Sequence, residues 1–165
     1  MPKLYIMSGL PFSGKTSLAK KIADRLGATY VCFDELWVSH EPDLPNDKVA
    51  GWRYVRDLAK TRISEELRAG TSVVYDDTNV GVDHRQEIRE VGQSLGAETI
   101  VVLAETPDEI RLERMQETLE TRNRHDVEAE HLKDAVEQFQ RPDASEGVVT
   151  YRPDEDLESW LGKLG

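Results

Sequence analysis

Eight consecutive residues near the amino terminus have the types and spacing of a loop that binds phosphate. They read Gly9-Leu10-Pro11-Phe12-Ser13-Gly14-Lys15-Thr16, a GxxxxGKT pattern between the apolar run Leu4–Met7 and a helical run from Ser17. Glycines let main-chain N–H groups turn toward phosphate oxygens, and the start of a helix adds partial positive charge. Lys15 can reach the β- and γ-phosphates, and the Thr16 hydroxyl can ligate Mg²⁺. The pattern therefore predicts a nucleoside triphosphate site rather than a glycine turn before an ordinary helix, formed by Gly9, Pro11, Phe12, Ser13, Gly14, Lys15, Thr16 and Ser17.

Acidic residues follow two further apolar runs. Asp34 comes after the run that begins at Tyr30, and Asp76 comes after Val73-Val74-Tyr75. Ligands of open α/β sheets bind at the carboxyl ends of the strands, so both carboxylates are candidates for a site. Asp76 resembles the aspartate of a Walker B element and is predicted to hold Mg²⁺ together with Thr16. Asp34 is predicted to be the general base that accepts a proton from a hydroxyl acceptor, and the alternative is a helix cap or turn acid.

Several arginines could stabilise the charge on a transferring phosphoryl group. The candidates are Arg85, Arg111, Arg114, Arg122 and Arg124. Two of them lie in the polar interval 117–130, which joins two segments of helical periodicity. This interval has the composition expected of a mobile lid over a phosphate site, and equally of a solvated surface hairpin.

Apolar runs alternate with helical periodicities, which predicts an α/β fold with a parallel sheet covered on both faces. The predicted strands are Leu4–Met7, Tyr30–Phe33, Ser72–Tyr75, Thr99–Leu103 and Val148–Tyr151. Asn46 is a candidate cap for the helix that carries Val55 and Ile63, and Thr106-Pro107-Asp108-Glu109 has the pattern of a capping box. With no internal repeat or linker, residues 1–165 are predicted to form one domain.

The composition narrows the classes of partner. The chain has 165 residues and a net charge of −11, from 21 basic and 32 acidic residues. This acidity weighs against general nucleic-acid binding, which is mainly electrostatic. No apolar run reaches the ~18 residues of a membrane span, and the first residues lack the pattern of a signal peptide. The single cysteine, Cys32, is expected in the core and excludes an intrachain disulfide, so a cytoplasmic protein is predicted.

Taken together, the motifs resemble the small P-loop kinases related to polynucleotide kinase, chloramphenicol phosphotransferase and zeta toxin. The resemblance covers most of residues 3–151. It rests on the phosphate loop, Phe33-Asp34-Glu35, Val74-Tyr75-Asp76-Asp77-Thr78-Asn79 with Arg85, Arg111 and Arg114, Arg122 to Val127, and Phe139-Gln140-Arg141-Pro142 before Glu146-Gly147. It implies a P-loop NTPase fold with a five-stranded sheet of order 2-3-1-4-5 and a helical lid.

The same resemblance implies roles for individual residues. Asp34 corresponds to the catalytic base, and the lid arginines that clamp phosphates correspond to Arg114 and to either Arg122 or Arg124. Polynucleotide kinases resemble one another in having an arginine three residues after the base, where this chain has Trp37. An aromatic residue there favours a less charged acceptor.

The expected function is transfer of the γ-phosphate of ATP, with Mg²⁺, to a hydroxyl of a small-molecule or nucleoside-like acceptor. Two alternatives remain. One is a 5′-hydroxyl polynucleotide kinase, and the other is a non-catalytic or regulatory nucleotide-binding NTPase.

Overall fold

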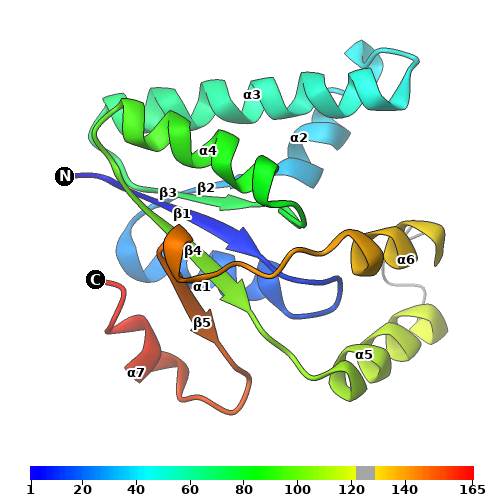
Figure 1. Ribbon diagram of the computed structural model, residues 1–165. Helices are drawn as coiled ribbons and strands as arrows, with labels where there is room; N and C mark the ends of the chain where they lie inside the picture. Colours follow the sequence, from blue (N-terminus) through cyan, green and yellow to red (C-terminus); the bar gives the residue numbers. More distant parts are fainter. Residues whose placement is uncertain (122–128) are drawn as a thin grey trace.

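A five-stranded parallel sheet forms the centre of the computed structural model, which describes residues 1–121 and 129–165, with side chains for 1–121 and 132–165 (Figure 1). The strands are β1 (Lys3–Ser8), β2 (Thr29–Cys32), β3 (Val73–Asp76), β4 (Glu98–Ala104) and β5 (Val148–Tyr151). Their order, β2-β3-β1-β4-β5, confirms the predicted 2-3-1-4-5 arrangement. Every pairing is parallel, so the carboxyl ends of all five strands lie at one edge.

Helices cover both faces of this sheet. They are α1 (Lys15–Leu26), α2 (Phe33–Ser39), α3 (Lys48–Arg68), α4 (Val82–Ser94), α5 (Asp108–Thr121), α6 (Ala129–Gln138) and α7 (Leu157–Leu161). Figure 1 shows α3 and α4 on one face, α1 and α7 on the other, and α5 and α6 beyond the carboxyl edge. Short 3₁₀ turns occupy Glu41–Asp43 and Ala144–Glu146. Among the described residues, no helix combines the length and apolar character needed to cross a membrane.

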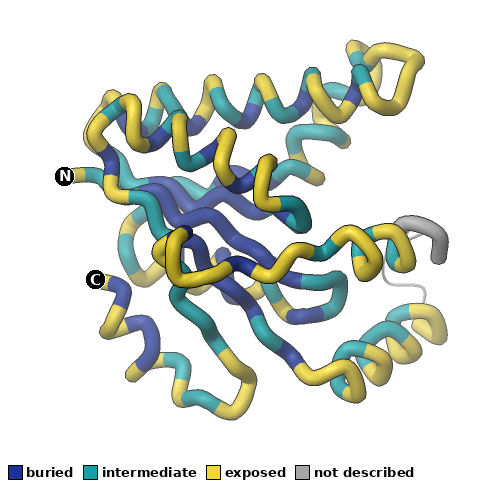
Figure 2. Tube along the Cα trace, in the orientation of Figure 1, coloured by how far each residue is buried: buried dark blue, intermediate teal, exposed yellow. Residues whose placement is uncertain are grey.

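Alternating strand residues supply two cores, which appear as the buried centre of Figure 2. Tyr5 and Met7 of β1 face α1 and α7, where Ile22 and Trp160 pack against them. Leu4 and Ile6 face the other side, where α3 and α4 contribute residues such as Ile63 and Ile88. Because successive side chains of a strand point to opposite faces, a strand buried on both sides must be almost continuously apolar.

The segment after β2 differs from the sequence prediction. Phe33 was predicted to end a strand, but β2 ends at Cys32, which is buried as expected, and Phe33 begins α2. Asp34 and Glu35 therefore lie in the first turn of a helix, where negative charge is favourable. This seven-residue helix is too short to show a clear apolar period.

The predicted cap of α3 was displaced by one residue. The side chain of Asp47, not that of Asn46, accepts a hydrogen bond from the main-chain N–H of Ala50 (2.8 Å). Either residue type caps a helix well, so the sequence alone could not distinguish them.

Candidate functional site

The loop between β1 and α1 has a backbone that only glycine permits at two points. At Gly9, a Cβ atom would lie 2.8 Å from Ser13 Oγ and 3.0 Å from the carbonyl oxygen of Ala104. Gly14 has a φ of 84° and stands at the N-cap of α1, with no side-chain hydrogen bond to cap the helix in the described part of the chain. The first N–H groups of α1 and its positive dipole end are therefore available to an anion, as the GxxxxGKT pattern predicts.

Three side chains from the β4–α5 region hold three consecutive carbonyls of this loop. Arg111 donates to the carbonyl of Pro11 (3.3 Å), Arg114 to that of Phe12 (3.1 Å), and Thr106 to that of Ser13 (2.7 Å). Carbonyl oxygens repel anions, so their engagement by donors favours phosphate on the amide side of the loop. Thr106 was predicted to belong to a capping box, and its hydroxyl also ties α5 to the phosphate loop through the carbonyl of Ser13.

Ser13 itself has an unsatisfied side chain. Its hydroxyl is buried at the loop and has no hydrogen-bond partner among the described residues. A buried polar atom without a partner is costly in a folded protein. An incoming phosphate oxygen would supply the missing partner, so this residue fits a bound nucleotide.

Lys15 and Asp76 form an ion pair at the mouth of the loop. Lys15 Nζ contacts Asp76 Oδ1, and the hydroxyl of Tyr30 donates to Asp76 Oδ2 (2.7 Å). Burial alone would raise the pKa of Asp76, but Lys15 and hydrogen bonds from Tyr30 and Thr16 together hold that pKa below its usual value of 3.8. Asp76, only 2% exposed, is therefore an ionised carboxylate in contact with the two residues that the motif assigns to phosphate and metal.

These side chains fit a magnesium site completed by phosphate. Thr16 and Asp76 offer a hydroxyl and a carboxylate oxygen, which are the hard ligands that Mg²⁺ prefers. In the described ranges no three His, Cys, Asp or Glu residues cluster as a metal cage. Mg²⁺ usually takes one or two carboxylates, waters and the phosphates of its substrate, so no such cage is required.

Asp34 lies at the same edge of the sheet as the phosphate loop. It follows β2 directly, and Cys32 at the end of β2 pairs with Asp76 at the end of β3. Neighbouring strands are about 4.8 Å apart, so β2 and β1 lie roughly 10 Å apart with β3 between them. The carboxylate of Asp34 is exposed. Trp37, one turn further along α2, packs its ring edge against Gly51 of α3, 3.0 Å from the position of a Cβ atom there.

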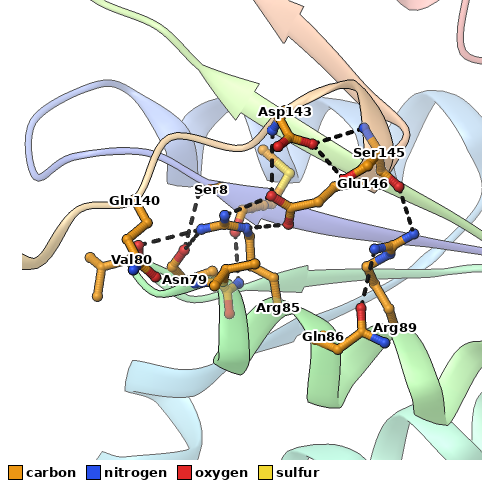
Figure 3. Close-up of polar contacts among 12 residues, drawn as sticks. Ser8, Asn79, Val80, Arg85, Gln86, Arg89, Gln140, Asp143, Ser145 and Glu146 are labelled. Carbon is orange, nitrogen blue, oxygen red and sulfur yellow. Dashed lines mark hydrogen bonds and ion pairs between the residues drawn. The ribbon is translucent and has the colours of Figure 1, made fainter.

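Arg85 does not belong to a phosphate clamp. It is fully buried and forms a two-point ion pair with Glu146, Nε to Oε2 at 2.7 Å and Nη2 to Oε1 at 2.8 Å (Figure 3). Its remaining Nη1 donates to the carbonyl of Asn79 (2.9 Å). Arg85 was a candidate because it follows the Thr78-Asn79 turn in the sequence. Its positive charge is instead neutralised by Glu146, which lies 61 positions further along the chain.

The other predicted arginines divide into two groups. Arg111 and Arg114 lie on α5 and contact the phosphate loop. Arg122 and Arg124 lie outside the described residues. Of the interval 117–130 that was predicted as a lid, residues 117–121 end α5 and residues 129–130 begin α6.

A hollow of about 640 Å³ adjoins the phosphate loop. Its walls come from the loop itself and from the segments after β4, α6 and β5, and include Leu10, Ser13, Pro107, Arg111, Phe139 and Pro153. Its lining combines apolar side chains with three arginines and three acidic residues, Glu105, Asp108 and Asp154. Pockets that bind small molecules are typically lined by apolar groups with a few polar ones, so the hollow could take the nucleoside part of a triphosphate.

The sequence analysis missed Tyr30 and Thr106 as parts of this site. Tyr30 was treated only as an apolar strand residue, although it lies on the strand that pairs with β3. A polar side chain one strand away from a buried carboxylate is a signal that could have identified it. Thr106 gave no such signal, because its contact with Ser13 joins residues 93 positions apart.

A kinase-type sheet of order 2-3-1-4-5, a GxxxxGKT loop between β1 and α1, and a buried aspartate at the end of β3 define a P-loop NTPase. The chain belongs to the AAA_33 family, described as an AAA domain, which matches residues 4–142. This confirms the resemblance to small P-loop kinases. A search of curated proteins gives no match.

Solved structures share the fold across almost the whole chain. Kti12 from Chaetomium thermophilum, in complex with ADP-AlF3, has a TM-score of 0.82 at 17% identity and covers 98% of this chain and 96% of its own. An unliganded sugar kinase from Janibacter sp. HTCC2649 has a TM-score of 0.70 at 17% identity, with coverages of 99% and 92%. The APS kinase CysC of Mycobacterium tuberculosis, in complex with AMPPNP and APS, has a TM-score of 0.65 at 19% identity, with coverages of 99% and 95%.

Proposed function

We propose that this protein, as a single P-loop kinase domain spanning residues 1–165, transfers the γ-phosphate of ATP to a hydroxyl of a small-molecule or nucleoside-like acceptor. The observation that carries the proposal is that three features lie at the same edge of the sheet. They are the phosphate loop with its uncapped helix start, the Lys15–Asp76 ion pair, and Asp34. The kinases among the structural neighbours support the same class of reaction. We expect the protein to act in the cytoplasm, where Cys32 would stay reduced.

In the proposed reaction, the loop residues Gly9 and Pro11–Ser17 hold the triphosphate. Lys15 leaves Asp76 and binds the β- and γ-phosphates as a point charge. Thr16 and Asp76 would then hold Mg²⁺, which neutralises charge on the phosphates. Asp34 accepts the proton of the acceptor hydroxyl as the new O–P bond forms, the bond from the γ-phosphorus to the bridging oxygen breaks, and ADP departs.

Arg114 is the proposed clamp for the transferring phosphoryl group. Its Nη1 lies 3.1 Å from the position that a Cβ atom of Gly14 would occupy, so the guanidinium already adjoins the loop. A short movement from the carbonyl of Phe12 would bring it to a phosphate oxygen. Either Arg122 or Arg124 is proposed as a second clamp for the phosphoryl group. The interval 117–130, which carries both residues, is proposed to act as a lid over the phosphate site.

Replacing Lys15 tests the nucleotide site. We expect Lys15→Met to weaken ATP binding by about 1.5–3 kcal/mol, the range for hydrogen bonds to charged groups, which is roughly 10- to 150-fold in Kd. Titration calorimetry with ATP measures the change. Lys21→Met is the matched control, because Lys21 is an exposed residue of the same helix. Equal affinities for the two variants would contradict the proposed site.

A panel of acceptors tests the reaction itself. ADP formation from ATP and Mg²⁺ is measured with water alone, with sugars and nucleosides, and with a 5′-hydroxyl oligonucleotide at low salt. The proposal predicts that a small hydroxyl compound raises ADP formation and appears as its phosphate ester. Phosphorylation of the oligonucleotide would instead identify a polynucleotide kinase. Binding of ATP with equal, slow hydrolysis in every case would identify a regulatory NTPase.

A further inference from the structure

Tyr30 connects the edge strand of the sheet to the carboxylate proposed to hold the metal. Its hydroxyl donates to Asp76 Oδ2 at 2.7 Å. Its ring is half-buried, packs against the core between the sheet and α1, and lies 5.4 Å below the ammonium group of Lys20. The ring therefore has a fixed place, set by β2 and α1 rather than by the phosphate loop.

The two oxygens of Asp76 have partners of different kinds. Oδ1 contacts the ammonium group at the end of the long, flexible side chain of Lys15. Oδ2 accepts from a phenol that has only two side-chain torsions and sits on the strand paired with β3, where Tyr30 lies opposite Val74 and Cys32 opposite Asp76. Lys15 can leave when a nucleotide arrives, whereas Tyr30 can remain.

The Tyr30 hydroxyl has one proton, and it donates this proton to Oδ2 of Asp76. Burial is the largest cause that raises the pKa of this hydroxyl above the usual 10, followed by a hydrogen bond with the Cys32 side chain and by the charge of Asp76. With Oδ2 held by this phenol, Oδ1 is the oxygen that becomes available when Lys15 leaves.

We propose that Tyr30 is a positioning residue for Asp76. It holds Oδ2 of the carboxylate in place, so that Oδ1 can release Lys15 and bind the magnesium ion of the bound nucleotide. This inference rests on the proposed function. It assigns Tyr30 no contact with ATP or with the acceptor. Hydrogen-bond partners that orient a metal ligand typically change metal affinity or activity by about 10- to 100-fold when they are removed.

Tyr30→Phe removes the hydroxyl and keeps the ring. Tyr5→Phe is the matched control, because the Tyr5 hydroxyl makes one buried hydrogen bond, to the carbonyl of Leu164 (3.2 Å), in the same core but away from the site. Mn²⁺ binding to each protein saturated with a non-hydrolysable ATP analogue is followed by electron paramagnetic resonance. Binding of the analogue in EDTA is measured separately by calorimetry, and thermal unfolding verifies that both variants are folded.

We expect Tyr30→Phe to bind Mn²⁺ in the nucleotide complex about 10-fold or more weakly than wild type, with metal-free affinity within about twofold. Tyr5→Phe is expected to match wild type in both measurements. Unchanged Mn²⁺ affinity in Tyr30→Phe would overturn the positioning role while leaving the proposed function intact. A wild-type protein that binds no nucleotide in either measurement would overturn both.

Discussion

Asp34→Asn is expected to lower turnover with a true acceptor by about 10²- to 10⁴-fold, the usual contribution of a general base. Asparagine has almost the same shape but cannot accept the acceptor proton at neutral pH. Asp34 is exposed in the first turn of α2, so the substitution should leave the fold intact. Affinity for ATP should also be unchanged, because the phosphate loop and Lys15 supply that binding. Steady-state kinetics and calorimetry on the same preparation measure the two effects.

The neighbouring carboxylate provides the control. Glu35 is exposed and lies in the same turn, and its carboxylate makes a 3.8 Å surface contact with Lys20. Glu35→Gln should therefore keep turnover within about twofold, since exposed ion pairs contribute little. Full turnover in Asp34→Asn would remove Asp34 from the mechanism. Equal losses in both variants would indicate a general effect of negative charge rather than a specific base.

Glu146→Gln is expected to destabilise the protein by about 3–5 kcal/mol, the typical cost of breaking a buried ion pair by removing one partner. Arg85 is fully buried and Glu146 is 4% exposed, so the loss of the carboxylate removes the charge that pairs directly with the guanidinium. The exposed Asp143 lies near enough to interact with Arg85 but forms no ion pair with it among the described residues. Glu146 also accepts a hydrogen bond from the main-chain N–H of Asp143 (3.4 Å), within the capping box that precedes β5. Urea unfolding, followed by circular dichroism, measures the free energy of unfolding.

A surface ion pair serves as the comparison for this variant. Glu105 pairs with Arg141 and with Arg152 (2.7 Å for the latter), and all three side chains are partly or mostly exposed. Glu105→Gln should cost no more than about 1 kcal/mol. If the two variants lost similar, small amounts of stability, the Arg85–Glu146 pair would not be a main support of the loop after β3.

The fold was predictable because its signals are local. The strand predictions fall within one residue of the observed ends, since nearly continuous apolar runs such as Ile100 to Leu103 mark strands buried on both faces. The apolar positions Val55, Ala59, Ile63 and Leu67 are all buried along α3, as their spacing predicts. The sheet order came from the family resemblance and not from these patterns. The short helices α2 and α7 escaped prediction, because five to seven residues are too few to display a helical period.

The candidate site was most predictable where one segment carries a motif. The loop from Gly9 to Ser17 is recognisable from the sequence, because a loop that holds phosphate needs glycine, lysine and threonine at fixed, nearby positions. Arg85 was misjudged for the opposite reason, since its role depends on Glu146 near the other end of the chain. The contacts of Tyr30 with Asp76 and of Thr106 with Ser13 are of the same kind, as they join residues that only the folded sheet brings together.

The most direct test of the central claim is a crystal structure with Mg²⁺ and a non-hydrolysable ATP analogue. It should place the γ-phosphate against Lys15 and the main-chain amides near Gly14, with Lys15 withdrawn from Asp76. It should also place the carboxylate of Asp34 across an open space from that phosphate, in line for an acceptor hydroxyl. A nucleotide bound elsewhere, or Asp34 turned away from the γ-phosphate toward the outer side of β2, would contradict a phosphotransferase that uses this edge of the sheet.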